Sequence, residues 1–131
     1  MRLLADTHIL LRWLREPKRL SREQLRSLEA SLLRAEPVGI SAASLLEIAI
    51  LCADGAITLT QPVDEFFENL EANPALQILP ITCAIAAEVV ATGPLRVPAD
   101  RAIVATARCH RLMLVTSDQR IIQSGLVRVI E

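Results

Sequence analysis

Short apolar runs alternate with helix-like segments along the chain, and this alternation limits the possible folds more than any other feature. The apolar runs occupy residues 3–5, 38–40, 76–79, 112–115 and 127–130. Between them, apolar residues recur every three or four positions, as in amphipathic helices. Strands separated by helices favour a mainly parallel sheet, because parallel neighbours need long crossover connections. The sequence therefore predicts an α/β fold with about five strands and helices on both faces.

Capping residues mark where the expected helices begin. Ser21 and Gln24 form a capping box in front of a helix with Leu25, Leu28 and Leu32 on one face. The other expected helices cover residues 9–15 and 41–53, begin at residue 62, and cover residues 82–93, 98–111 and 118–125. Glycine or proline follows several of these segments, which is typical of a helix end.

The length and composition indicate one domain, residues 1–131, with a substantial core. At 131 residues, roughly two thirds of the unfolded chain's surface can be buried. A hydrophobic content of 52% excludes disorder. The longest uncharged stretch, residues 72–87, contains two prolines and is too short to span a membrane. An acidic residue at position 6 interrupts any signal-like segment, and three cysteines without a Cys-x-x-Cys motif suggest reduced thiols. We expect a soluble cytoplasmic protein.

The charges are distributed unevenly along the chain. Residues 1–34 carry a net charge of +4, residues 35–95 carry −8, and residues 96–131 carry +3. Thirteen of the fourteen basic residues are arginine, which suits bidentate contacts with phosphate. Most of these charges fit solvated helix faces equally well. With one Trp and two Phe, a stacking platform for single-stranded RNA is not expected.

Four acidic residues stand where a ligand crevice is expected. Asp6 directly follows the first predicted strand, and Asp118 follows the fourth. Asp100 begins the helix at 98–111, and Glu47 lies inside the apolar helix at 41–53. In open parallel sheets, ligands bind at the carboxyl ends of the strands. We therefore treat these four acids as candidate site residues.

Each acid also has a purely structural interpretation. The three aspartates could serve only as N-caps or first-turn acids of the helices that follow them. Glu47 has no capping role, but Ser41, Ser44 and Glu47 are spaced as a thin solvent-facing stripe. Taken singly, these alternatives stay open.

Convergence of all four acids in one crevice would require a cation. Like charges in one site raise one another's pKa, and a divalent metal relieves that repulsion. Oxygen ligands without His or Cys suit Mg²⁺ or Mn²⁺ rather than zinc. Such a metal polarises phosphoryl oxygens and activates water, so phosphodiester hydrolysis is the natural chemistry.

Other catalytic motifs are absent. The glycines form neither a P-loop nor a dinucleotide-binding fingerprint, and no Gly-x-Ser-x-Gly elbow occurs. His8 lies two residues after Asp6 and could reach the crevice, but a His on the first turn of an amphipathic helix is more often structural. His110 lies at a helix end, where the helix dipole accounts for it.

The segments around the four acids resemble those of the PIN-domain ribonucleases, specifically the VapC-like toxins of type II toxin–antitoxin systems. The resemblance spans nearly the whole chain and rests on LLADTHILLRWL from residue 3, ISAASLLEIAI from residue 40, LPIT from residue 79, PADRAIVATA from residue 98 and LVTSD from residue 114. Any one segment alone is a weak signal. Together, in this order, they are specific.

The resemblance implies a three-layer α/β/α sandwich and a function. It implies that Asp6, Glu47, Asp100 and Asp118 form the metal site, with Thr116 as a hydroxyl nearby. It also implies a Mg²⁺- or Mn²⁺-dependent endoribonuclease that acts on structured RNA such as tRNA or rRNA. The expected partners are a cognate antitoxin, which blocks the site, and a second copy of the chain in a homodimer.

Two positions depart from the pattern of many such toxins. Val97 stands where relatives often have an Asp, and Ala99 where they often have an aromatic residue.

Two rival functions stay open. One rival is a non-catalytic PIN-like module that holds a partner in an apolar groove. The other is a metal-dependent DNase or flap-type nuclease with the same site chemistry. Arg101, Arg108 and Arg120 are candidate phosphate contacts.

Overall fold

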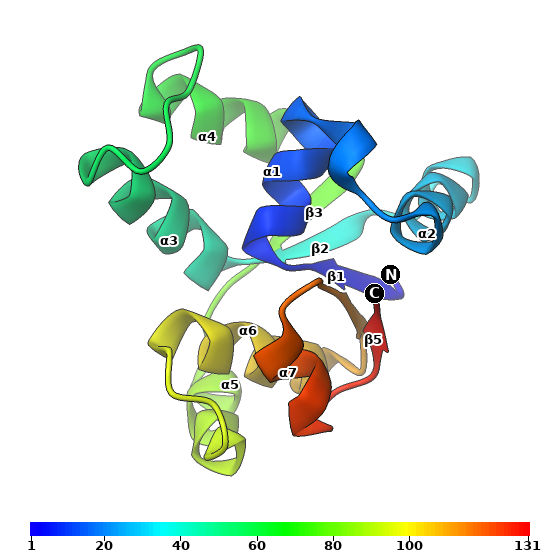
Figure 1. Cartoon of the computed structure of the whole chain (residues 1–131), viewed down its shortest axis with the longest axis vertical. Helices are drawn as coiled ribbons and strands as arrows, with labels where there is room; N and C mark the ends of the chain where they lie inside the picture. The colour runs from blue at the N-terminus through cyan, green and yellow to red at the C-terminus, as the bar shows by residue number, and fades with distance from the viewer.

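Five parallel strands form the sheet at the centre of the computed structural model, which describes residues 1–131 (Figure 1). The strands are β1 (Leu3–Ala5), β2 (Val38–Ser41), β3 (Leu76–Leu79), β4 (Met113–Val115) and β5 (Val129–Ile130). Their order across the sheet is β3-β2-β1-β4-β5, and every neighbouring pair is parallel. The predicted α/β class is confirmed, and the predicted mainly parallel sheet is entirely parallel.

Helices cover both faces of the sheet, which gives the expected three layers (Figure 1). Helices α1 to α4 lie above the sheet in that view, and α5 to α7 lie below it. The helices are α1 (Thr7–Arg15), α2 (Arg22–Leu33), α3 (Ala42–Ala53), α4 (Val63–Ala72), α5 (Cys83–Glu88), α6 (Pro98–His110) and α7 (Gln119–Ser124). Two short 3₁₀ turns, Pro17–Arg19 and Val89–Thr92, extend α1 and α5.

Alternating side chains of the strands build two separate hydrophobic cores. On β1, Leu3 and Ala5 pack into one cluster with Ile9, whereas Leu4 packs into the other with Ile103. Successive strand residues point to opposite faces, so a sheet covered on both sides must be apolar at every position. This accounts for the uninterrupted apolar runs in the sequence.

Local signals predicted most helix boundaries correctly. The capping box forms as expected: the Ser21 hydroxyl accepts from the Gln24 backbone N–H at 3.0 Å, and the Gln24 side chain accepts from the Ser21 N–H at 2.9 Å. Thr82 caps α5 by accepting from Ile85 N–H at 3.2 Å. Gly125 ends α7 with a left-handed φ of 66°, which glycine adopts without strain.

Two sequence expectations were wrong in detail. The buried face of α2 runs through Gln24 and Leu28, whereas Leu32 is 45% exposed. The helix is rotated in this way because the Gln24 side chain reaches inward to the loop after β4. The last strand is also shorter than predicted and begins at Val129.

Two further observations concern the helices and the cysteines. None of the helices combines the length and apolarity needed to cross a membrane. Cys52, Cys83 and Cys109 form no disulfide.

The order of the strands places a crevice beside the centre of the sheet. The chain passes from β1 to β2 by helices on one face, and from β3 to β4 by helices on the other. The connections therefore diverge between β1 and β4, and such a divergence opens a crevice at the carboxyl ends of the strands.

A substitution at Ile40 tests the hydrophobic cluster that contains Leu3, Ala5 and Ile9. Its side chain on β2 is fully buried, so Ile40→Ala should lower the free energy of unfolding by about 2–5 kcal/mol. Leu33→Ala is the matched control, because Leu33 is 89% exposed. Urea denaturation measures both variants. Equal losses in the two would contradict the assigned core.

Candidate active site

Asp6 is the most firmly held acid of the crevice. It directly follows β1, caps α1 and is only 3% exposed. Its Oδ1 accepts from the Thr7 backbone N–H at 2.8 Å, and its Oδ2 accepts from the Thr116 hydroxyl at 2.7 Å. Hydrogen bonds of this kind stabilise a buried carboxylate and fix its orientation. The capping role and a role in the site therefore coincide in one residue.

The loop after β4 brings Asp118 to the same place. Thr116 is fully buried, and its hydroxyl also accepts from the Asp118 backbone N–H at 3.1 Å. One hydroxyl thus connects Asp6 with the loop that carries Asp118. Asp118 in turn caps α7 by accepting from the Arg120 backbone N–H at 2.9 Å.

Asp100 enters the crevice from the first turn of α6. Pro98 occupies the first helical position, where its missing N–H costs nothing. Asp100 is 7% exposed, and its Oδ2 lies 3.3 Å from Nη2 of Arg120. It is not the capping residue, since Val97 is the N-cap and provides no side-chain bond.

Glu47 reaches the crevice from α3, a helix tied directly to α1. The Thr7 hydroxyl donates to Ser44 Oγ at 2.9 Å, one turn before Glu47. Ser44 and Ser41 are fully buried, and Ser41 caps α3. The alternative of a solvent-facing stripe through Ser41, Ser44 and Glu47 is therefore wrong, because both serines bond inside the protein.

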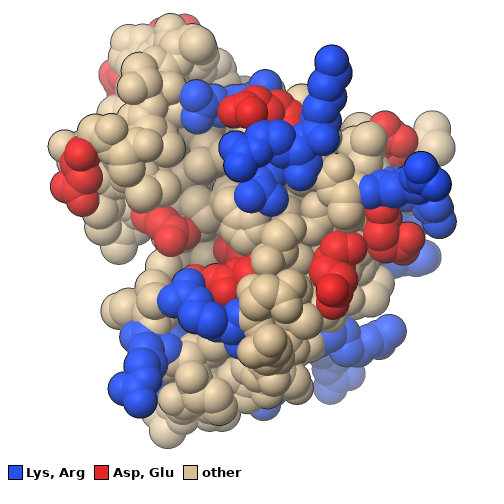
Figure 2. Space-filling view, viewed as in Figure 1, with Lys and Arg blue, Asp and Glu red and all other residues tan.

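All four acids line one cavity of about 170 Å³. The space-filling view shows acidic side chains in the hollow between α3 above and α6 and α7 below, with basic side chains on its rim (Figure 2). The remaining lining residues are Thr7, His8, Leu11, Leu51, Val97 and Arg120. The crevice predicted at the carboxyl ends of the strands thus contains every acid singled out from the sequence.

Burial and neighbouring groups shift the pKa values of Asp100 and Asp118 in opposite directions. Burial, followed by the nearby charges of Asp118, Asp6 and Glu47, raises the pKa of Asp100 from 3.8 to about 6. The hydrogen bonds from Arg120 lower the pKa of Asp118. Asp100 is therefore the acid that most needs a positive partner at neutral pH.

His8 lies in the wall of the cavity. Its Nε2 accepts from the Ser117 backbone N–H at 3.0 Å, and its Nδ1 lies 3.5 Å from Asp6 Oδ2. Burial lowers the pKa of His8 against the opposing charge of Asp6, so the ring is neutral at pH 7 with its proton on Nδ1. Sequence reasoning gave His8 a structural role. In the structure, His8 plays this role in the wall of the cavity, where it accepts a hydrogen bond from the Ser117 backbone.

Sequence reasoning missed Gln24 as a supporting residue. Its side chain is buried, and Nε2 donates to Ser117 Oγ at 2.8 Å and to the Thr116 carbonyl at 3.3 Å. Together with His8, it anchors the loop between β4 and α7 from two helices. The capping box identified Gln24, but nothing local indicated a second set of bonds 92 residues away.

The donor set fits a hard divalent cation such as Mg²⁺ or Mn²⁺. It consists of carboxylates, with no thiolate among the cavity residues. No three His, Cys, Asp or Glu side chains stand close enough together here to hold a metal ion. Two of the four carboxylates, Asp100 and Asp118, instead contact the guanidinium of Arg120. The chemistry of the donors therefore fits such a cation, while Asp100 and Asp118 face Arg120 in this structure.

Only one of the three candidate arginines lies in the cavity. Arg120 lines it. Arg101 donates to the Thr92 hydroxyl at 3.1 Å and to a carbonyl of the turn after α5, and Arg108 pairs with Glu88 at 2.7 Å. The structure gives Arg101 and Arg108 a packing role outside the acidic cavity.

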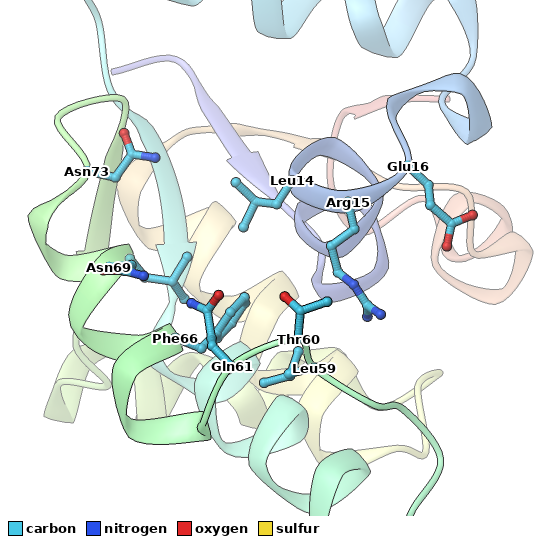
Figure 3. Close-up of a pocket in the computed structure, with 10 residues that line it drawn as sticks. Leu14, Arg15, Glu16, Leu59, Thr60, Gln61, Phe66, Asn69 and Asn73 are labelled. Carbon is cyan, nitrogen blue, oxygen red and sulfur yellow. The ribbon is translucent and has the colours of Figure 1, made fainter.

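Two larger cavities lack this concentration of acids. A groove of about 550 Å³ between α1 and α4 is lined by Leu14, Phe66 and several amides, with Glu16 as its sole acid (Figure 3). A second groove of about 590 Å³ runs along α3 and is lined mostly by apolar residues. It shares Glu47, Leu51 and Val97 with the acidic cavity.

The raised pKa of Asp100 predicts a gain in stability when its charge is removed. Folding favours the protonated carboxyl, so the metal-free protein loses stability as the pH rises from about 4 through about 6. After allowance for solvent screening, Asp100→Asn should stabilise it at pH 7.5 by about 1–2 kcal/mol. The gain should disappear below pH 4. Denaturation in EDTA measures it, with exposed Asp64→Asn as control. Lower stability of the Asp100 variant at pH 7.5 would contradict this assignment.

Comparison with known proteins identifies relatives of this chain. The family model described as PIN domain matches residues 3–125. Ribonuclease VapC22 of Mycobacterium tuberculosis is 34% identical over 119 residues, covering 90% of this chain and 88% of that protein.

Two solved structures also match over nearly the whole chain. A toxin–antitoxin complex from Klebsiella pneumoniae has a TM-score of 0.66 and 25% identity, covering 98% of this chain and 96% of that one. The structure of VapBC2 from Rickettsia felis, bound to a DNA fragment from its promoter, has a TM-score of 0.71 and 12% identity. The match covers 98% of this chain and 97% of that one. The second likeness concerns the fold alone. The chain therefore belongs to the PIN-domain family, and its resemblance to the VapC ribonucleases is confirmed.

Proposed function

We propose that this protein is a metal-dependent endoribonuclease, the toxin of a toxin–antitoxin pair. One observation carries the proposal: Asp6, Glu47, Asp100 and Asp118 converge in a single cavity at the carboxyl ends of the strands. The 34% identity to a named ribonuclease over most of the chain supports the same activity.

In this proposal, Asp6, Glu47 and Asp100 hold Mg²⁺ or Mn²⁺. Asp118 completes the cluster or positions the attacking water. When bound, the cation supplies Lewis-acid activation for hydrolysis of a phosphodiester. No nucleophilic side chain is required for this chemistry, and the cavity presents no cysteine or serine.

The surrounding residues keep the acids in place before substrate arrives. The Thr116 hydroxyl holds Asp6 at 2.7 Å, and His8 and Gln24 fix the backbone around Ser117. Because these partners are buried or half-buried, Asp6 and the backbone of the loop before Asp118 lose little freedom when a ligand binds. Arg120 is the one arginine that lines the cavity, and its guanidinium, now paired with Asp100 and Asp118, is suited to a phosphate.

The substrate in this proposal is structured RNA, such as tRNA or rRNA, whose cleavage would inhibit translation in the cytoplasm. A cognate antitoxin would neutralise the protein by blocking the site. The toxin–antitoxin complexes among the matching folds support this partner.

We further propose a homodimer formed through the apolar groove along α3. Leu46, Ile50 and Ile81 line this groove and are 64%, 50% and 44% exposed. Large apolar side chains gathered on one exposed face favour an interface. Because Glu47 lines both this groove and the acidic cavity, the dimer would bring two sites near its interface.

The two rival functions make different demands on the acidic cavity. A PIN-like binding module would need an apolar groove but no cation, so it would capture its partner without divalent-cation binding. A DNase or flap-type nuclease would share the cation, and competition between matched RNA and DNA separates it from a ribonuclease.

Asp6→Asn tests the nuclease. The amide matches the carboxylate in shape and can keep hydrogen bonds to Thr7 and Thr116, but it removes the charge. Cleavage should fall at least about a hundredfold, because electrostatic activation by a cation is worth several kcal/mol. The assay uses labelled total tRNA and a structured rRNA fragment in Mg²⁺, Mn²⁺ and EDTA.

Exposed Asp64→Asn is the matched control and should cut like wild type. Full activity of the Asp6 variant would remove the proposed mechanism. Absence of both cutting and cation binding in wild type would favour the binding module.

A double substitution tests the homodimer. Leu46→Glu with Ile50→Glu places two charges on the proposed interface, where burial without a partner is costly. The protein should change from dimer to monomer in light scattering after gel filtration. Leu33→Glu is the control, because Leu33 is an exposed residue of α2 that does not line the groove. It should leave the dimer intact. A wild-type monomer, or a double variant that still dimerises, would refute this interface.

A further inference from the structure

Arg120 bridges two acids that come from different helices. Its Nη2 lies 3.0 Å from Asp118 Oδ2 and 3.3 Å from Asp100 Oδ2, and its Nε donates to Asp118 Oδ1 at 3.3 Å. Asp100 begins α6, whereas Asp118 and Arg120 belong to the beginning of α7. A single guanidinium therefore supplies positive charge to two acids of the cavity.

The two sides of this contact differ strongly in burial. The Arg120 side chain is 66% exposed, whereas those of Asp100 and Asp118 are 10% and 19% exposed. An exposed arginine loses little when it returns to water, because solvated ion pairs contribute only about 0–1 kcal/mol each. The buried acids have no such alternative, since unpaired charges of like sign in one cavity repel one another. The acids therefore need a cation more than Arg120 needs the acids.

We propose that Arg120 occupies the place of the divalent cation in the metal-free site and exchanges with it. When the cation binds, Asp100 and Asp118 turn to it, and the released guanidinium swings outward to bind a phosphate of the substrate. This inference rests on the proposed function. It also accounts for the absence of three converging metal ligands, because two of the acids face Arg120.

Neither neighbouring candidate arginine is free to act in this way. Arg101 is bound to Thr92 and to the Val89 carbonyl, and Arg108 is bound to Glu88 and to the Leu126 carbonyl. Arg120 has no partners other than the two acids of the cavity. Its release therefore breaks no contact that holds the fold.

Calorimetric titration with Mn²⁺ tests the exchange directly. Arg120→Ala removes the competing cation, so it should bind Mn²⁺ about threefold to tenfold more tightly than wild type at low salt. Arg120→Lys, which keeps the charge, should bind close to wild type. Arg128→Ala is the matched control, because it makes the same change in net charge at an exposed residue outside the cavity. Thermal unfolding verifies that each variant is folded.

The second measurement concerns the released guanidinium. Stopped-flow anisotropy of labelled total tRNA, read before cleavage proceeds, gives the dependence of binding on salt. With Mn²⁺ present, Arg120→Ala should make the slope shallower by about one counterion relative to wild type. In EDTA the two slopes should agree, because Arg120 is then held by the acids.

The outcomes separate this inference from the proposed nuclease. Equal or weaker Mn²⁺ binding by Arg120→Ala, with binding abolished by Asp6→Asn, would overturn the exchange and leave the metal site standing. Failure of both wild type and Arg120→Ala to bind Mn²⁺ would overturn the metal site and the exchange together. A loss of salt slope in EDTA equal to that in Mn²⁺ would also contradict the exchange, because Arg120 would then contact RNA at all times.

Discussion

The repulsion among carboxylates gathered at one edge of the sheet is the constraint on which this structure depends. Asp6 and Asp100 are almost fully buried, and Asp118 and Glu47 share their cavity. A protein tolerates such a cluster only if donors and cations neutralise it. The Thr7 N–H and the Thr116 hydroxyl serve Asp6, whereas Arg120 serves the other two aspartates. Burial, followed by the charges of Asp118, Asp6 and Glu47, still raises the pKa of Asp100 to about 6, so this compensation is incomplete.

The fold supports the cluster by fixing the loop after β4 from several directions. Gln24 reaches it from α2 and His8 from α1, and Thr116 connects it to the end of β1. Helices α1 and α2 lie on the same face of the sheet, so their two anchors meet at the loop after β4. Hydrophobic packing thus sets the positions, and the hydrogen bonds set the orientations. The apolar groove, which is lined in part by Glu47, lies next to the acids.

The sequence by itself determined most of the helices and strands and the acids of the candidate site. Uninterrupted apolar runs indicated strands buried on both faces, and caps at Ser21 and Thr82 marked helices where they form. Asp6 and Asp118 follow predicted strands and Asp100 begins a predicted helix, so the convergence of these three acids at one sheet edge followed from the α/β class. These properties are local or periodic, and the chain displays them without long-range information.

Only the tertiary structure decided which side chains meet across the sequence. Gln24 bonds the loop 92 residues later, and Asp6 accepts from Thr116 across 110 residues. No periodicity encodes such pairs, which is why the face of α2 and the position of Leu32 were mistaken. The same holds for the three arginines: packing binds Arg101 and Arg108 to other partners and leaves Arg120 at the acids. The sequence shows which side chains can bond or carry charge. The tertiary structure decides which of them meet, because hydrogen bonds and charge interactions depend on distance through space and not along the chain.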